Sequence, residues 1–207
     1  MMQSPERPTI VRTIIGDSKH EVDSIVCGST KDNHSVIATY TAAVAVNFTD
    51  WIGKTLPWAR HELARYALTD NLRCEAVQDH VGMLLNFAFY SDATPEAEHY
   101  QHVRGAVFEI RQLFADPKTA GLSGVALCAV LENTSEIFIP DLAKRAKECG
   151  CKDFTYTDVH GIADVEHSDA FTKATIAELT MDYGLHDEQI VLKAATLAVN
   201  LIRAIYS

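Results

Sequence analysis

Helical spacing of apolar residues is the feature that most constrains the fold of this 207-residue chain. Few segments alternate between apolar and polar residues as strands do, and the Gly and Pro turn signals are widely spaced. An Asp-Ala-Thr-Pro-Glu run at residues 92–96 is a typical helix start, and Gly150 is a typical helix terminator. The pattern predicts an all-α chain of about seven helices, of which six can be placed, over residues 34–48, 55–74, 95–114, 122–147, 154–183 and 187–205.

The first part of the chain differs from the rest. Pro5 and Pro8 precede an apolar stretch at residues 11–15, and residues 28–33 are polar. These features favour a partly irregular N-terminal arm over residues 1–33. Residues 34–207 contain no repeat, linker or low-complexity tract, so they are predicted to form one helical-bundle domain, which also carries the candidate metal ligands described below.

Charge and cysteine content exclude several classes of protein. Lys and Arg number 18 against 28 Asp and Glu, which gives a formal net charge of −10. Such a surface opposes binding to nucleic acid or to an anionic membrane. Five cysteines form no CxxC pair, and no signal peptide or membrane-spanning run is visible, so we expect reduced thiols in a cytoplasmic protein.

Three potential metal ligands share one helical stripe near the end of the chain. His160, Asp164 and His167 have offsets of four and seven residues, which place them within roughly 60° of one another on a helix. Two imidazoles and a carboxylate are ligand types that hold a non-haem transition metal. A buried Asp164 without such a partner would be costly, so a metal site is a better interpretation than a hydrogen-bonded structural cluster.

Two other segments supply further ligand types from neighbouring helices. Glu132 and Glu136 lie one turn apart on the helix predicted at residues 122–147. Glu75 and His80, with Asp79 between them, lie near the end of an earlier helix. Mixed oxygen and nitrogen ligands suit iron or manganese better than structural zinc.

These residues resemble the haem-oxygenase-like di-iron oxidases and oxygenases, a family related in scaffold to TenA-like and PqqC-like proteins. The resemblance spans roughly residues 58–183 and rests on the His-x3-Asp-x2-His stripe and on a Glu-x3-Pro pattern formed by Glu136 and Pro140. It implies a haem-oxygenase-like helical bundle and a catalytic metal site whose ligands are Glu75, His80, Glu136, His160, Asp164 and His167. Glu132 remains an alternative to Glu136, and Asp79 an alternative to one member of the earlier pair, which is closer in sequence than the family spacing.

The function that the resemblance implies is O2-dependent oxidation by two Fe2+ ions per chain. The substrate would be a small amino-acid-derived or fatty-acid-like molecule, undergoing N-oxygenation, C–C cleavage or desaturation. An external electron donor and a homodimer are further expectations. Two alternatives stay open: a metal-free TenA-like hydrolase with Cys74 or Cys128 as the nucleophile, and a non-catalytic helical binding protein.

Overall fold

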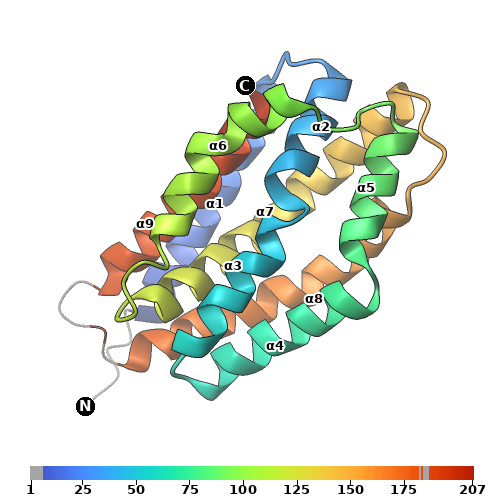
Figure 1. Ribbon diagram of the computed structural model, residues 1–207. Coiled ribbons are helices and arrows are strands. Elements are labelled where there is room, and N and C mark those ends of the chain that lie inside the picture. Colours follow the sequence, from blue (N-terminus) through green and yellow to red (C-terminus); the bar gives the residue numbers. More distant parts are fainter. Residues whose placement is uncertain (1–6, 182, 184–186) are drawn as a thin grey trace.

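A computed structural model describes residues 7–181, 183 and 187–207, except for the side chains of residues 162–165. The described residues form an all-helical fold (Figure 1), as predicted, with nine α-helices rather than about seven. The elements are α1 (Arg7–Gly28), α2 (Asn33–Val44), α3 (Asn47–Thr55), η1 (Leu56–Trp58), α4 (Glu62–Val77), α5 (His80–Tyr90), α6 (Ala97–Gln112), α7 (Ala120–Glu148), α8 (Thr155–Glu178), η2 (Leu179–Met181) and α9 (Asp187–Tyr206).

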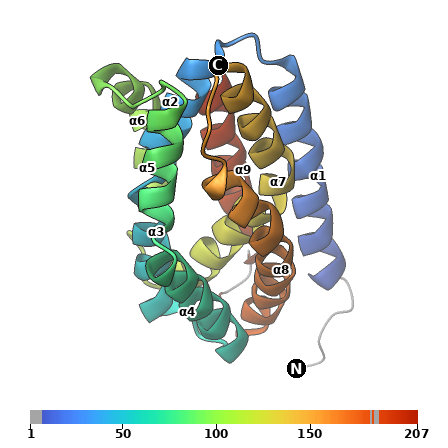
Figure 2. The same ribbon diagram turned by 90° about the vertical axis from the view of Figure 1, so that its right-hand side faces the viewer.

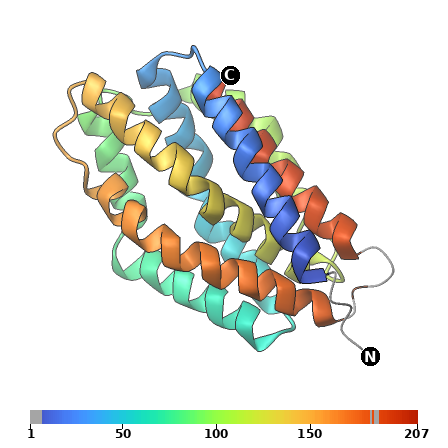
Figure 3. The same cartoon turned by 180° about the vertical axis from the view of Figure 1, so that it is seen from behind.

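Residues 7–28 of the predicted N-terminal arm form the helix α1, and residues 1–6 lie outside the described residues. In α1 the buried residues Val11, Ile15, Val22 and Val26 recur at helical spacing, and this stripe packs on α9 and α7. Figure 3 shows α1 and α9 side by side. Pro8 lies in the first turn of α1, where a helix tolerates proline because the missing N–H has no helical partner there. Pro8 therefore begins a helix here rather than preventing one.

The helix predicted over residues 55–74 is also divided. Pro57 lies in the short helix η1, and α4 begins at Glu62 after His61, whose side chain accepts a hydrogen bond from the Leu63 N–H. This break separates α3 from α4. It also sets the direction of α4, which runs alongside α8 (Figure 2). The additional helix α3 comes from a second break at Ala45 and Val46, inside the helix predicted over residues 34–48.

Helix α7 is the centre of the bundle. It contacts α8, α9, α1, α3 and α2, and every residue from Ala120 to Glu132 is buried. At Gly124 a Cβ atom would lie 1.8 Å from Thr55 Oγ1, so the absence of a side chain lets α3 approach closely. The helix ends as predicted, with Gly150 at φ 82°, a left-handed conformation that glycine adopts without strain.

Helices α7 and α9 are long and apolar enough to cross a membrane by length and composition. However, 83% of the most apolar window of α7 and 50% of that of α9 are buried inside the structure. Apolar helices with this burial are what the core of a folded helical domain requires.

Asp32 caps the start of α2, and its removal should lower stability. Its carboxylate accepts a hydrogen bond from the Ser35 N–H at 2.9 Å. Hydrogen bonding from Ser35, first from its side chain and then from this N–H, lowers the Asp32 pKa. We expect Asp32→Ala to cost about 1 kcal/mol at neutral pH, measured by urea unfolding. Since the folded-state pKa is depressed, the stabilisation is present above the unfolded value of about 3.9 and is lost as pH falls through the folded-state pKa. A difference between the two proteins that persists unchanged below that pH would contradict this assignment.

Candidate metal centre

A break between α4 and α5 brings Glu75 and His80 together. Glu75 lies in the last turn of α4 and His80 in the first turn of α5. Between them Asp79 takes a left-handed conformation and caps α5 by accepting a hydrogen bond from the Gly82 N–H. The break explains the short sequence spacing, since Glu75 Oε1 and His80 Nδ1 lie 2.9 Å apart although no continuous helix would pair them. The alternative ligand Asp79 is exposed and serves as the cap.

His160 completes a group of three potential ligands. One donor atom from each of Glu75, His80 and His160 lies within 4.8 Å of the other two. The imidazole of His160, on α8, packs edge-on against that of His80, with ring centroids 4.7 Å apart. Glu75 and His80 are 8% and 2% exposed, so their polar atoms are largely removed from water. Two imidazoles and one carboxylate with open positions form the ligand set of many non-haem Fe(II) sites.

The hydrogen bonds of His80 fit a cation at this position. His80 Nδ1 faces Glu75 Oε1, and Nε2 faces Gln78 Oε1, also at 2.9 Å. A neutral imidazole has only one N–H, but both ring nitrogens face an oxygen when the Gln78 amide is oriented in this way. One nitrogen lone pair therefore faces the lone pairs of a carboxylate or amide oxygen. A metal ion held between Nδ1 and Glu75 would remove that conflict, and Gln78 would then orient the ring through Nε2–H. The residues present therefore fit a bound metal.

Glu132 and Glu136 have different surroundings. Glu132 is 5% exposed and lines the same cavity as Glu75, His80 and His160. The Glu136 side chain is 42% exposed, and its carboxylate pairs with Lys19 on α1 at 2.9 Å. The structure therefore brings the alternative residue Glu132 to the candidate centre and leaves Glu136 at the surface.

His167 lies two turns beyond His160 on α8, next to Glu132. Its Nδ1 lies 3.8 Å from Glu132 Oε2 and 3.1 Å from Asn71 Nδ2. The same Asn71 amide donates to Glu132 Oε1 at 2.9 Å. The side chains of Glu132 and His167 thus meet at the buried amide of Asn71. Asn71 was not identified from the sequence. Asp164 lies on α8 between the two histidines, but its side chain falls outside the described residues.

The cavity beside these ligands has a volume of about 50 Å³. Its wall is mostly apolar and comes from seven helices, with aromatic side chains Tyr40, Phe48, Trp51, Phe138 and Tyr156. The hydroxyl groups of Tyr40 and Tyr156 are hydrogen-bonded at 2.7 Å, so they add little free polarity to the wall. The sequence offered Tyr66, Phe87, Phe89, Tyr90 and Phe138 as aromatic candidates for a substrate wall, and of these only Phe138 lines the cavity, because the buried face of each helix depends on tertiary packing. The cavity suits a small apolar group next to a polar metal-binding end.

The thiols that the hydrolase alternative requires lie in unfavourable surroundings for a nucleophile. Cys128 is buried, and burial followed by the nearby Glu132 charge raises its pKa well above the usual range. Burial and the charge of Asp70 also raise the Cys74 pKa. Neither cysteine lines the cavity. Since the thiolate is the reactive form, a raised pKa opposes nucleophilic catalysis by either residue.

Alkylation should separate these cysteines by rate. We expect iodoacetamide to modify the exposed Cys27 in the folded protein and to leave Cys128 intact until the chain unfolds, because Cys128 is both inaccessible and protonated. Peptide mass spectrometry over a time course measures both rates. Modification of Cys128 as fast as Cys27 under native conditions would contradict the burial described above.

The described residues form an all-α fold, and the donor set is of a type that can hold a non-haem metal ion. The model of a family described as iron-containing redox enzyme matches residues 36–202, which is most of the chain. The chain therefore belongs to this family of iron-containing redox enzymes, and the resemblance inferred from the sequence is confirmed at that level. Family membership supports an oxidoreductase that contains iron.

Structural similarity agrees on the scaffold. A crystal structure of a TenA homolog from Pseudomonas syringae pv. tomato strain DC3000 superposes with a TM-score of 0.64 and 12% sequence identity, covering 95% of this chain and 89% of that chain. At this identity the similarity shows the fold alone. No curated protein sequence matches the chain.

Proposed function

We propose that this protein is a non-haem di-iron oxidase or oxygenase that uses O2 to oxidise a small organic substrate in the cavity. The observation that carries the proposal is the convergence of Glu75, His80 and His160 with the buried Glu132 on one mostly apolar cavity. An oxygen-and-nitrogen donor set beside an apolar pocket is suited to redox chemistry on an apolar group. The iron-containing redox family supports the same reaction class.

The ligands divide naturally between two ions. Glu75, His80 and His160 would hold the first, since their donor atoms already lie close together. Glu132 and His167 would hold the second together with Asp164, once the Asn71 amide moves from between Glu132 and His167. Glu132 thus replaces Glu136 in the proposed centre.

Bound iron would supply the one-electron chemistry with O2 that no amino-acid side chain provides. The protein's own groups would orient the ligands and exclude water. Gln78 fixes the His80 ring through Nε2, and the buried Tyr156 packs on the His160 ring with centroids 4.4 Å apart. The aromatic wall would keep the reacting group dry and close to the centre. A cavity of about 50 Å³ accommodates a few waters or a small apolar group, and we propose an amino-acid-derived or fatty-acid-like substrate.

Further expectations from the resemblance are part of this proposal. An external electron donor would return the centre to the ferrous state, and two chains would form a homodimer. The metal-free hydrolase is less well supported, since the thiols of Cys74 and Cys128 have raised pKa values and lie outside the cavity wall.

Oxygen consumption tests the proposed reaction class. Protein loaded with Fe2+ under anaerobic conditions should consume O2 on mixing and show a transient absorbing species. His160→Ala, which removes a ligand of the first ion, should lower the rate of O2 consumption by about 100-fold or more, because a direct ligand matters at least as much as its supporting groups. O2 consumption by the His160→Ala protein equal to that of the wild type would contradict the proposal.

A further inference from the structure

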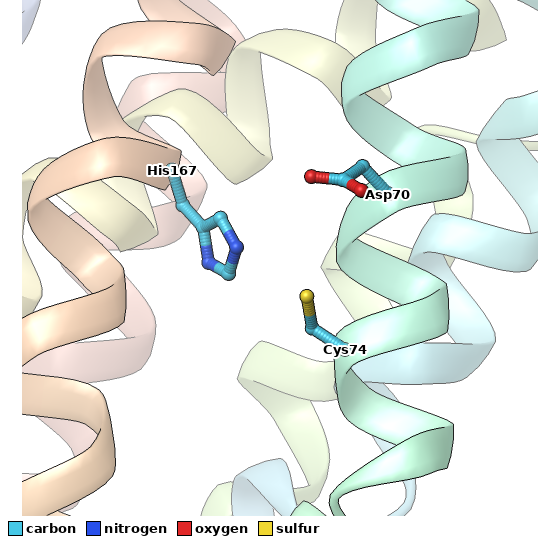
Figure 4. A group of neighbouring side chains, drawn as sticks. All are labelled: Asp70, Cys74 and His167. Atoms are coloured by element: carbon cyan, nitrogen blue, oxygen red, sulfur yellow. The ribbon is translucent and has the colours of Figure 1, made fainter.

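A second group of ligand-type side chains lies outside the cavity wall. Donor atoms of Asp70, Cys74 and His167 all lie within 4.8 Å of one another. Figure 4 shows the three side chains directed towards a common space between α4 and α8. None of them lines the cavity, and the proposed function uses only His167.

The positions of these residues follow from helix geometry. Asp70 and Cys74 are four residues apart on α4, so they lie on one face, and that face packs against α8, which carries His167. All three residues are partly buried. The only cation that pairs with Asp70 among the described residues is Arg73, at 3.3 Å, and the Arg73 side chain is 74% exposed. Such an exposed pair contributes little and would not prevent a metal ion from binding.

The His167 ring is already oriented for this role. Its Nδ1 side faces Asn71 at 3.1 Å and Glu132 at 3.8 Å. Figure 4 shows a ring nitrogen turned towards Asp70 and Cys74, and since Nδ1 is occupied on the other side, we take that nitrogen to be Nε2. A ligating histidine that directs its other nitrogen to a carboxylate is a common arrangement in metal sites, and Glu132 would provide that carboxylate.

We propose that Asp70, Cys74 and His167 bind one divalent cation of the zinc class through a carboxylate oxygen, Sγ and Nε2, with water as the fourth ligand. A thiolate, an imidazole and a carboxylate match the ligand preferences of Zn2+ better than those of Fe2+. The thiolate and the carboxylate together balance the charge of the ion. On binding, the Cys74 thiol releases its proton to solvent, while the imidazole keeps one proton, which moves from Nε2 to Nδ1. The Asn71 amide, whose N–H donates to Nδ1 in the structure, must then move aside so that Nδ1–H can donate to Glu132.

This site would compete with the second iron for His167. This competition rests on the proposed function, in which His167 and Glu132 hold the second iron. His167 Nδ1 cannot carry a proton and bind iron at the same time. A zinc-class cation at Asp70 and Cys74, which requires that proton, would therefore leave the iron centre with one ion. Binding at the thiolate site itself does not depend on the iron proposal.

Cobalt binding tests the site directly. Titration of the full-length apoprotein with Co2+ should produce a thiolate-to-cobalt charge-transfer band in the near ultraviolet. Cys74→Ser should abolish the band, and Asp70→Asn should weaken Co2+ affinity by about tenfold or more. Cys27→Ser, which removes an exposed thiol elsewhere, is the matched control and should keep the band unchanged. Circular dichroism would establish that each variant is folded.

A second measurement separates this proposal from the iron centre. Zn2+ should protect Cys74 from iodoacetamide in both the wild type and His80→Ala, because His80 belongs to the cavity group alone. Loss of iron binding in His80→Ala with retained protection of Cys74 would support two distinct sites. A wild-type protein without the charge-transfer band, a Cys74→Ser protein that keeps it, or Zn2+ that leaves Cys74 alkylation unchanged would overturn the thiolate site, whatever the result with iron.

Discussion

Glu132→Gln is expected to lower O2-dependent activity by at least about 100-fold and to reduce iron content at saturation by about one ion per chain. The glutamine keeps the size of the side chain and an oxygen that can accept the Asn71 hydrogen bond, so packing should change little. The substitution removes the negative charge of the side chain, and a neutral amide binds a hard cation such as Fe2+ far less well than a carboxylate does. Iron analysis after anaerobic loading and O2-uptake rates measure the two effects.

Glu136→Gln is the matched control for that variant. It lies one turn away on the same helix and makes the same chemical change, but its carboxylate pairs with Lys19 at the surface. We expect iron content and activity within about twofold of the wild type, because an exposed ion pair contributes little. If Glu136→Gln loses iron while Glu132→Gln keeps it, the assignment of these two glutamates is wrong.

Glu178→Ala is expected to destabilise the protein by about 2–4 kcal/mol, the largest effect on folding that we predict. Glu178 is completely buried at the end of α8, and its carboxylate accepts from the N–H groups of Arg60 and His61 at 2.6 and 2.7 Å. Tyr183 donates its hydroxyl to the same carboxylate. Alanine would leave these donors without their charged acceptor and would release the start of α4 from the end of α8.

Thermal unfolding measures this effect. A loss of that size corresponds to a fall in Tm of about 5–15 °C for a chain of this length. Glu109→Ala, at an exposed position in the last turn of α6, is the control and should change stability by no more than about 0.5 kcal/mol. Equal Tm values for Glu178→Ala and Glu109→Ala would show that the Glu178 hydrogen bonds contribute nothing to stability.

The sequence predicted the helical class and several helix ends because those depend on local signals. The periodic apolar residues of α7, the glycine at 150 and the acidic start of α9 act within one or two turns. Helix α1 was missed because Pro8 is compatible with a first turn as well as with an irregular segment. The difference depends on whether the stripe around Val11 and Ile15 finds a surface to cover, which is a tertiary property.

The surroundings of Glu136 also depend on α1. Lys19 lies on α1, and this helix places a cation next to Glu136 at the surface. The sequence shows only that Glu132 and Glu136 are one turn apart, and the Glu-x3-Pro pattern favoured the one that the structure leaves more exposed. Glu75 and His80 were chosen from their residue types and from the resemblance, and the structure brings them together through a helix break. Asn71 had no metal-ligand signature and becomes visible only through its contacts with Glu132 and His167.

Iron stoichiometry is the most direct test of a di-iron centre in this protein. Apoprotein loaded with excess Fe2+ without oxygen, then freed of unbound metal, should retain about two iron ions per chain. Protein with His160→Ala, treated in the same way, should retain about one or none. A wild-type protein that retains no iron, or a His160→Ala protein that retains as much as the wild type, would contradict the proposed centre.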